Sequence, residues 1–110
     1  MDRVIHVESQ GAFEVARPKI GSDYVLDFSA VWCGPCKAIA PFYSKCAEKY
    51  GSIPFLKVDV DGCSAAAKEY NITAMPTFVF VKDSIVVTTV RGANQKSITE
   101  ALEKYYNVNE

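Results

Sequence analysis

Residues 24–36 read YVLDFSAVWCGPC, an apolar run that leads directly into two cysteines separated by two residues. The first seven residues are mostly apolar or aromatic, which is typical of a strand buried on both faces. Proline is well tolerated in the first turn of a helix, because its missing N–H is not needed there. The stretch therefore predicts a buried strand that passes without a linker into a helix, with Cys33 and Cys36 at the junction.

The segment after the cysteines has the periodicity of a helix. Within residues 34–50, four side chains recur at helical spacing and predict one buried face: Ile39, Tyr43, Cys46 and Tyr50. The same reasoning predicts strands at 4–7, 54–60, 77–81 and 85–90, and helices at 9–17, 62–70 and 95–106. Ser9 and Asn94 are suitable N-caps for two of these helices.

The order of these elements predicts an α/β fold with a central mixed five-stranded sheet. Strands separated by helices pair in parallel, and right-handed crossovers place helices on both faces of the sheet. The short connection at residues 82–84 makes the last two strands antiparallel. We expect three parallel strands plus an antiparallel hairpin, flanked by four helices, in a single domain over residues 1–110.

The composition limits which partners and which cellular compartment we expect. Lys and Arg number 12 against 13 Asp and Glu, so the chain has no basic excess for nucleic acid or an acidic membrane surface. Residues 1–8 contain no long apolar run typical of a secretory signal, and no segment has the length of a membrane span. We expect a cytoplasmic protein, small enough to enter the nucleus. In that reducing compartment its cysteines would not form a static disulfide framework.

Two cysteines separated by two residues are compatible with zinc binding, haem attachment or redox chemistry. Zinc needs two further ligands, usually a second close pair, and the candidates Cys46, Cys63 and His6 are scattered. Haem attachment requires a histidine directly after the second cysteine, where this chain has Lys37. Redox chemistry is the preferred interpretation, and no metal site is expected.

The position at a helix start favours a reactive thiolate. The first turn has N–H groups without intrahelical partners and the positive end of the helix dipole, so the pKa of Cys33 should fall. Cys36, three residues further on, should be more buried and should resolve a mixed disulfide. Gly34 and Pro35 carry no positive charge that would make the pair more oxidising, which favours a reductant.

Two charged residues interrupt apolar strands. Asp27 lies six residues before Cys33, and a buried carboxyl there would have a raised pKa suited to proton transfer. A solvent-facing aspartate is the alternative, which the apolar residues on both sides disfavour. Lys57 could lie beside Asp27, although a lysine with no catalytic part is equally compatible with the pattern. Pro76 precedes a strand, and the pattern alone does not decide whether its peptide bond is cis.

Residues 27–37, DFSAVWCGPCK, resemble the active-site segment of the thioredoxin family. The similarity extends to Pro41 and to the segments 57–61, 75–78 and 92–94, which together span nearly the whole chain. It implies the thioredoxin fold and a protein-disulfide reductase that maintains redox homeostasis as an electron donor. An oxidant or isomerase of the disulfide-isomerase type, a binding module built on the same fold, and a structural zinc protein remain as alternatives.

The resemblance implies roles for individual residues. Cys33 would be the nucleophile and Cys36 the resolving thiol, together forming the redox-active disulfide, with Asp27 as the proton-transfer group and Lys57 beside it. Pro76 would be a cis-proline facing the dithiol. The implied substrate-binding residues are Trp32, Gly34, Pro35, Met75, Pro76, Gly92 and Ala93.

The resemblance also implies partners. Electrons would come from NADPH through thioredoxin reductase, so the chain itself needs no bound cofactor. The substrate classes would be ribonucleotide reductase, peroxiredoxin and methionine sulfoxide reductase. We expect a monomer, since Ala74 stands where some animal members carry a cysteine that could link two chains.

Three further residues carry separate expectations. Cys46 lies on the apolar helix stripe and should be a packed core thiol. Cys63 is expected to be an inert surface thiol, with a reactive regulatory thiol at a helix start as the alternative. His6, in the first strand, is expected to be structural.

Overall fold

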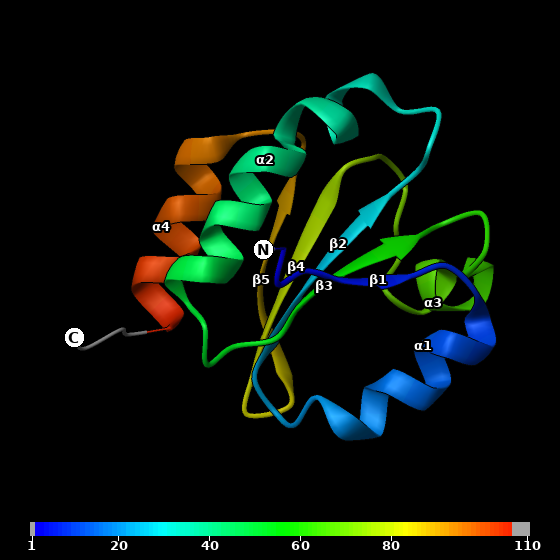
Figure 1. The fold of residues 1–110 in the computed structure, drawn as a ribbon, viewed down its shortest axis with the longest axis horizontal. Coiled ribbons are helices and arrows are strands. Elements are labelled where there is room, and N and C mark those ends of the chain that lie inside the picture. Colours follow the sequence, from blue (N-terminus) through cyan, green and yellow to red (C-terminus); the bar gives the residue numbers. More distant parts are fainter. Residues whose placement is uncertain (1, 107–110) are drawn as a thin grey trace.

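Five strands form one mixed sheet in the spatial order β1-β3-β2-β4-β5 (Figure 1). They are β1 (Ile5–Val7), β2 (Tyr24–Ser29), β3 (Phe55–Asp59), β4 (Thr77–Lys82) and β5 (Ile85–Arg91). Strands β1, β3 and β2 are parallel, whereas β4 is antiparallel to both β2 and β5. The computed structural model, which describes residues 2–106, therefore confirms the predicted three parallel strands and the hairpin.

Helices cover both faces of the sheet (Figure 1). They are α1 (Gln10–Ala16), α2 (Gly34–Lys49), α3 (Ser64–Glu69) and α4 (Gln95–Tyr105). Helices α2 and α4 cover one face, and α1 and α3 cover the other. Ser9 and Asn94 cap α1 and α4 as predicted, each accepting a backbone N–H with its side-chain oxygen. A 3-10 turn at Arg17–Lys19 follows α1, where the sequence had predicted only an end before Pro18.

Successive side chains of a strand point to opposite faces of the sheet, so each face has its own hydrophobic core. Under α2 and α4 lie Val25, Phe55, Phe78 and Phe80, together with the predicted stripe of α2 and with Ile98, Ala101 and Leu102 of α4. Leu26, Phe28, Leu56, Val58, Val79 and Val81 face α1 and α3. Tyr43 anchors α2 to the sheet, since its hydroxyl donates a hydrogen bond to the carbonyl of Leu56 over 2.7 Å. Asp27 alternates with Val25 and therefore belongs to the α2 face.

Asp83 and Ser84 form the tight turn between β4 and β5. Both have left-handed backbone conformations, with φ values of 54° and 66°. Two such residues match the twist of the flanking strands in a two-residue hairpin. The turn is tied to the chain before β2, because the N–H of Asp83 donates to Asp23 Oδ1 and the N–H of Ser84 to the carbonyl of Ser22.

Gly62 marks a close approach of two connections. It lies in the loop after β3, and a Cβ at this position would overlap the backbone carbonyl oxygen of Glu8, between β1 and α1. The carboxylate of Asp59 accepts the N–H of Gly62 over 3.2 Å, which holds the loop in place. Only glycine fits at this contact without a movement of the backbone.

Gly62→Ala should therefore lower the free energy of unfolding by about 2 kcal/mol or more, because the added methyl group must displace backbone. Gly11→Ala is the matched control: outside its chain neighbours and the helix's own backbone, no atom lies within 4 Å of the added methyl group. Since Gly11 is in α1, alanine there should raise the free energy of unfolding by about 0.5–1 kcal/mol. Urea unfolding of both variants measures these changes, and equal effects of the two substitutions would refute the close contact.

Candidate active site

Cys33 and Cys36 form a disulfide at the start of α2, with their Cα atoms 5.3 Å apart. A tight turn links β2 to this helix, closed by a hydrogen bond from the N–H of Cys33 to the carbonyl of Ala30. Cys33 is the N-cap of α2: its Sγ accepts the N–H of Cys36 over 3.2 Å, and its carbonyl accepts the N–H of Lys37. The structure therefore places the Cys33 sulfur among the unpaired donors of a helix start, as the sequence predicts.

The two sulfur-bearing residues differ in exposure. Cys36 is fully buried, whereas Cys33 retains 5% of its surface. Both pack with Ala30, and Val60 and Met75 lie against this small apolar cluster. A substrate from solvent can therefore approach Cys33 more readily than Cys36, which fits the order of reaction expected from the sequence.

The loops beside the dithiol bring several predicted substrate-binding residues together. The Met75–Pro76 peptide bond is cis. Met75 contacts the dithiol cluster, and the carbonyl of Pro76 accepts the N–H of Gly92 over 2.8 Å. Of the remaining predicted residues, Gly34, Pro35 and Ala93 are exposed.

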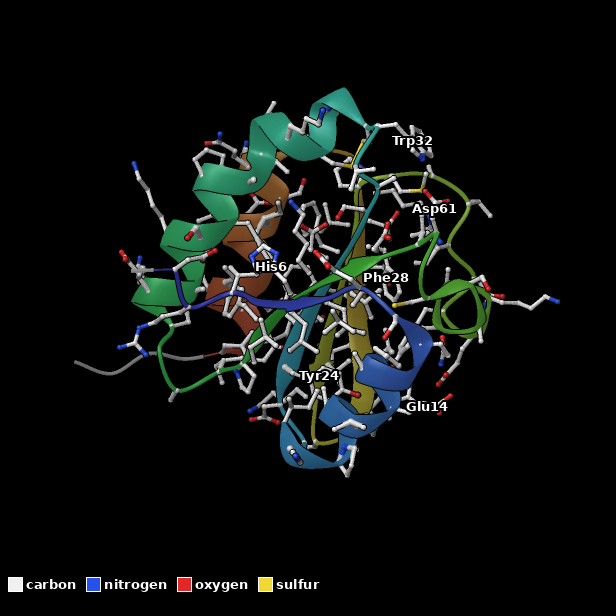
Figure 2. The ribbon with its side chains drawn as sticks, turned by 45° about the vertical axis from the view of Figure 1, so that its right-hand side comes forward. His6, Glu14, Tyr24, Phe28, Trp32 and Asp61 are labelled. Carbon is white, nitrogen blue, oxygen red and sulfur yellow. A yellow bond between two sulfur atoms is a disulfide. The ribbon has the colours of Figure 1, made fainter. Side chains whose placement is uncertain are left out.

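Trp32 stands beside the dithiol with 64% of its surface exposed. Its indole N–H donates to Asp61 Oδ2 over 2.9 Å, which links the start of α2 to the loop after β3 (Figure 2). Asp61 lies in a segment similar to the thioredoxin family, but no pattern in the sequence predicted this bond. The bond gives the exposed indole ring a fixed orientation.

Asp27 is completely buried, so the alternative of a solvent-facing carboxyl is wrong. In register it lies between Lys57 of β3 and Phe78 of β4. Within residues 2–106, neither of its carboxylate oxygens has a hydrogen-bond partner. Burial raises the pKa of Asp27 to about 7, and the positive charge of Lys57 opposes that rise.

Asp27 lies close to the helix that carries Cys36. It lines a small cavity together with Ala40 and Tyr43 of α2. Ala40 follows Cys36 by four residues, so the two lie on the same face of the helix, about one turn apart. The cavity therefore places the carboxyl against the face of α2 that also carries Cys36.

The other two cysteines lie on opposite faces of the sheet. Cys46 of α2 packs into the core that α2 and α4 cover, and burial raises its pKa to about 11, as expected for a core thiol. Cys63 is fully buried beneath α1 and α3, so the expectation of a surface thiol is wrong. Its side chain turns inward from the start of α3, with Sγ 3.7 Å from the carbonyl oxygen of Val7, and burial raises its pKa. These positions keep both thiols apart from the dithiol, so they cannot complete a four-ligand zinc site with it.

Comparison with known proteins gives a consistent result. The thioredoxin family model matches residues 4–104. The chain is 48% identical to thioredoxin 1 of Plasmodium falciparum over 81 residues, covering 74% of this chain and 78% of that protein. It is 42% identical to thioredoxin of Homo sapiens over 102 residues, covering 92% and 97% of the two chains. The crystal structure of a thioredoxin from Nicotiana alata superposes with a TM-score of 0.88 at 34% identity, covering 94% and 93% of the chains.

No helix among the residues that the structure describes is both long enough and apolar enough to cross a membrane.

Asp27→Asn should change the pH dependence of stability. The pKa of Asp27 is about 7 in the folded protein and 3.8 in the unfolded chain, so the folded state binds more protons between these values. The stability of the unaltered protein should therefore fall as pH rises from 4 to 7. For the oxidised protein, we expect the variant to be more stable by up to about 4 kcal/mol at pH 8, and nearly equal in stability at pH 4.

Urea unfolding at the two pH values measures this difference. Asp83→Asn is a suitable control, because Asp83 is exposed and asparagine accepts its left-handed backbone conformation. The control should follow the unaltered protein at both pH values. A constant difference between Asp27→Asn and the unaltered protein from pH 4 to 8 would contradict the raised pKa.

Proposed function

The chain belongs to the thioredoxin family, and we propose that Cys33 is the attacking thiol and Cys36 the resolving thiol in its reduction of protein disulfides. It is a protein-disulfide oxidoreductase that works by dithiol-disulfide exchange. The observation that carries the proposal is the Cys33–Cys36 disulfide in the first turn of α2, a helix that packs over a buried carboxyl. We further propose that residues 1–110 act as a single domain and as a monomer.

The reaction transfers two electrons in two exchange steps. In the reduced protein, the Cys33 thiolate attacks one sulfur of the substrate disulfide, forms a mixed disulfide and releases the other sulfur as a thiolate. The Cys36 thiolate then attacks Cys33 Sγ, which releases the second substrate thiolate and leaves the Cys33–Cys36 disulfide. N–H groups at the start of α2 stabilise the Cys33 thiolate, and the exposure of Cys33 makes it the first to meet substrate.

Cys36 must lose a proton before it can attack. Asp27 is the group we assign to take that proton, because it faces the side of α2 that carries Cys36 and has a pKa of about 7. A carboxyl that titrates near neutral pH is an effective general base at that pH. Lys57, its neighbour in β3, supports the ionised form of Asp27 through its positive charge.

The substrate is assigned to the exposed surface around the dithiol. Trp32, Gly34, Pro35 and Ala93 would contact it through apolar surface, and the backbone of Met75 would pair with an extended substrate segment as an added strand. Pro76 and Gly92 would shape the adjoining loop, through the hydrogen bond between them. A disulfide held in an extended segment would then lie across Cys33.

The oxidised protein has to be reduced again for each new cycle. We assign this step to thioredoxin reductase with electrons from NADPH, so that the chain needs no bound cofactor. The proposed substrates are ribonucleotide reductase, peroxiredoxin and methionine sulfoxide reductase, in the cytoplasm and, given the small size of the chain, in the nucleus. Neutral Gly34-Pro35 supports a reductant over an oxidant of the disulfide-isomerase type.

The chain should catalyse the reduction of insulin disulfides by NADPH in the presence of thioredoxin reductase. Turbidity from the precipitating insulin B chain and the loss of NADPH absorbance measure the reaction. A parallel assay with dithiothreitol separates the chemistry of the dithiol from recognition by the reductase. Absence of catalysis with both electron sources would contradict the function, and the Cys33→Ser/Cys36→Ser variant provides the background rate.

Cys36→Ser should accumulate mixed disulfides with substrate proteins, because the first exchange step can proceed and the second cannot. Mass spectrometry of the trapped species should find the bond at Cys33. Cys63→Ser in the same background is the matched control, and it should leave the trapping unchanged, since Cys63 is fully buried. Trapping through Cys63 would overturn the assignment of the nucleophile.

A further inference from the structure

Three titratable side chains form a row across the sheet beneath α2. His6 of β1 is the register partner of Lys57 of β3, and Lys57 is the partner of Asp27 of β2. Register partners on adjacent parallel strands point to the same face. The row therefore runs from a completely buried carboxyl to an imidazole at the edge of the sheet, and Figure 2 shows His6 on β1 beside α2.

A cavity of about 30 Å³ follows this row. Its polar lining includes Asp2, His6, Asp27, Ser44 and Lys57. Such a volume is sufficient for one or two water molecules, and the polar groups of the lining supply hydrogen-bond partners for them. Asp27 forms the buried end of the cavity, whereas the side chains of His6 and Asp2 are half exposed.

Hydrogen bonds fix the outer end of the cavity. The carboxylate of Asp2 accepts the N–H of Val4 over 3.0 Å and the hydroxyl of Ser44 over 2.8 Å, and its Oδ2 lies 3.2 Å from His6 Nε2. The first of these bonds, followed by those from Ser44 and His6, lowers the pKa of Asp2 to about 2. At neutral pH the carboxylate has no proton to donate, so Nε2 carries the hydrogen. Nδ1 of a neutral His6 ring is then left as a proton acceptor.

The charged groups around His6 come from four further segments. Lys57 faces it from β3, and Asp2 from the chain before β1. A second hollow, of about 220 Å³, lies beside His6 and Lys57 and is also lined by Glu8, Lys37 and Asp59. Only the smaller cavity has Asp27 in its wall.

We propose that His6 carries protons between Asp27 and solvent through this cavity, with Asp2 and Ser44 holding the imidazole in place. This role extends the proposed part of Asp27 as the base for Cys36 and depends on it. The proton that leaves the Cys36 thiol moves to the Asp27 carboxylate, then through water to Nδ1 of His6. The imidazolium releases a proton to solvent, so neither His6 nor Asp27 changes its charge over a full cycle.

The test measures proton exchange at Asp27 directly, by NMR of its ¹³C-labelled side-chain carboxyl near the midpoint of its titration. In His6→Gln, which keeps a donor for Asp2 but takes up no proton near neutral pH, the exchange rate should fall by roughly tenfold. Loss of a direct general acid or base typically slows a reaction by roughly 100-fold or more. The effect expected here is smaller than that. Added imidazole should restore the rate. His6 is the one histidine of the chain, so the variant contains no other imidazole.

His6→Arg separates proton transfer from a simple charge effect, because arginine keeps a positive charge but does not exchange its proton in this range. A relay predicts slower exchange in both variants, with rescue by imidazole. A charge effect predicts instead that the pKa of Asp27 moves in opposite directions in the two variants at an unchanged exchange rate, and this result would overturn the proposal. An exchange rate that neither variant nor imidazole changes would overturn it as well.

The proposed function is tested separately by single-turnover oxidation of the reduced protein, monitored by Trp32 fluorescence. If Asp27→Asn leaves the resolving step unaffected, the assignment of Asp27 as the base fails. If Asp27→Asn slows the step while the His6 variants exchange protons normally, only the relay fails.

Discussion

The site depends on the position of β2, which is paired along both edges and covered on both faces. Its parallel pairing with β3 and antiparallel pairing with β4 fix the register of Asp27 against Lys57 and Phe78. A slip of one residue would turn Asp27 and the four apolar or aromatic side chains of β2 to the opposite face of the sheet. Because α2 begins only a short turn after β2, the same register also sets where Cys33 meets the first N–H groups of the helix.

A carboxyl at the centre of this strand opposes stability. The sheet would gain from an uncharged side chain at position 27, since the ionised form has no hydrogen-bond partner among the residues described. Several kcal/mol is a large share of the roughly 5–15 kcal/mol by which a domain of this size is stable. The burial that costs stability is also what brings the pKa of the acid to about 7, where it can exchange protons with a thiol. Lys57 limits both the loss of stability and the rise of the pKa, because its charge favours the ionised form of Asp27.

Local patterns predicted most of the fold, because the signals that define its elements lie within each segment. The continuous apolar run in β2 also predicted that Asp27 is buried, since its neighbours are apolar on both sides. The failures concern contacts between distant segments. The bond from Trp32 to Asp61 spans 29 residues, and Cys63 is buried because α1 and β1 cover it. No local pattern indicates either contact, and the same holds for the cavity that joins His6 to Asp27.

The proposed relay would give the two ends of the site separate access to solvent, and this separation would follow from the sheet order. The dithiol lies beyond the C-terminal end of β2, among the exposed loops assigned to the substrate. A docked protein would cover that surface and exclude water from it, so a proton released there during the resolving step would have no open path. The row from Asp27 to His6 instead crosses the sheet through β3 and ends at the edge strand β1. With the proposed relay, the parallel part of the sheet and its short edge strand would keep Asp27 in contact with solvent while the substrate occupies the dithiol.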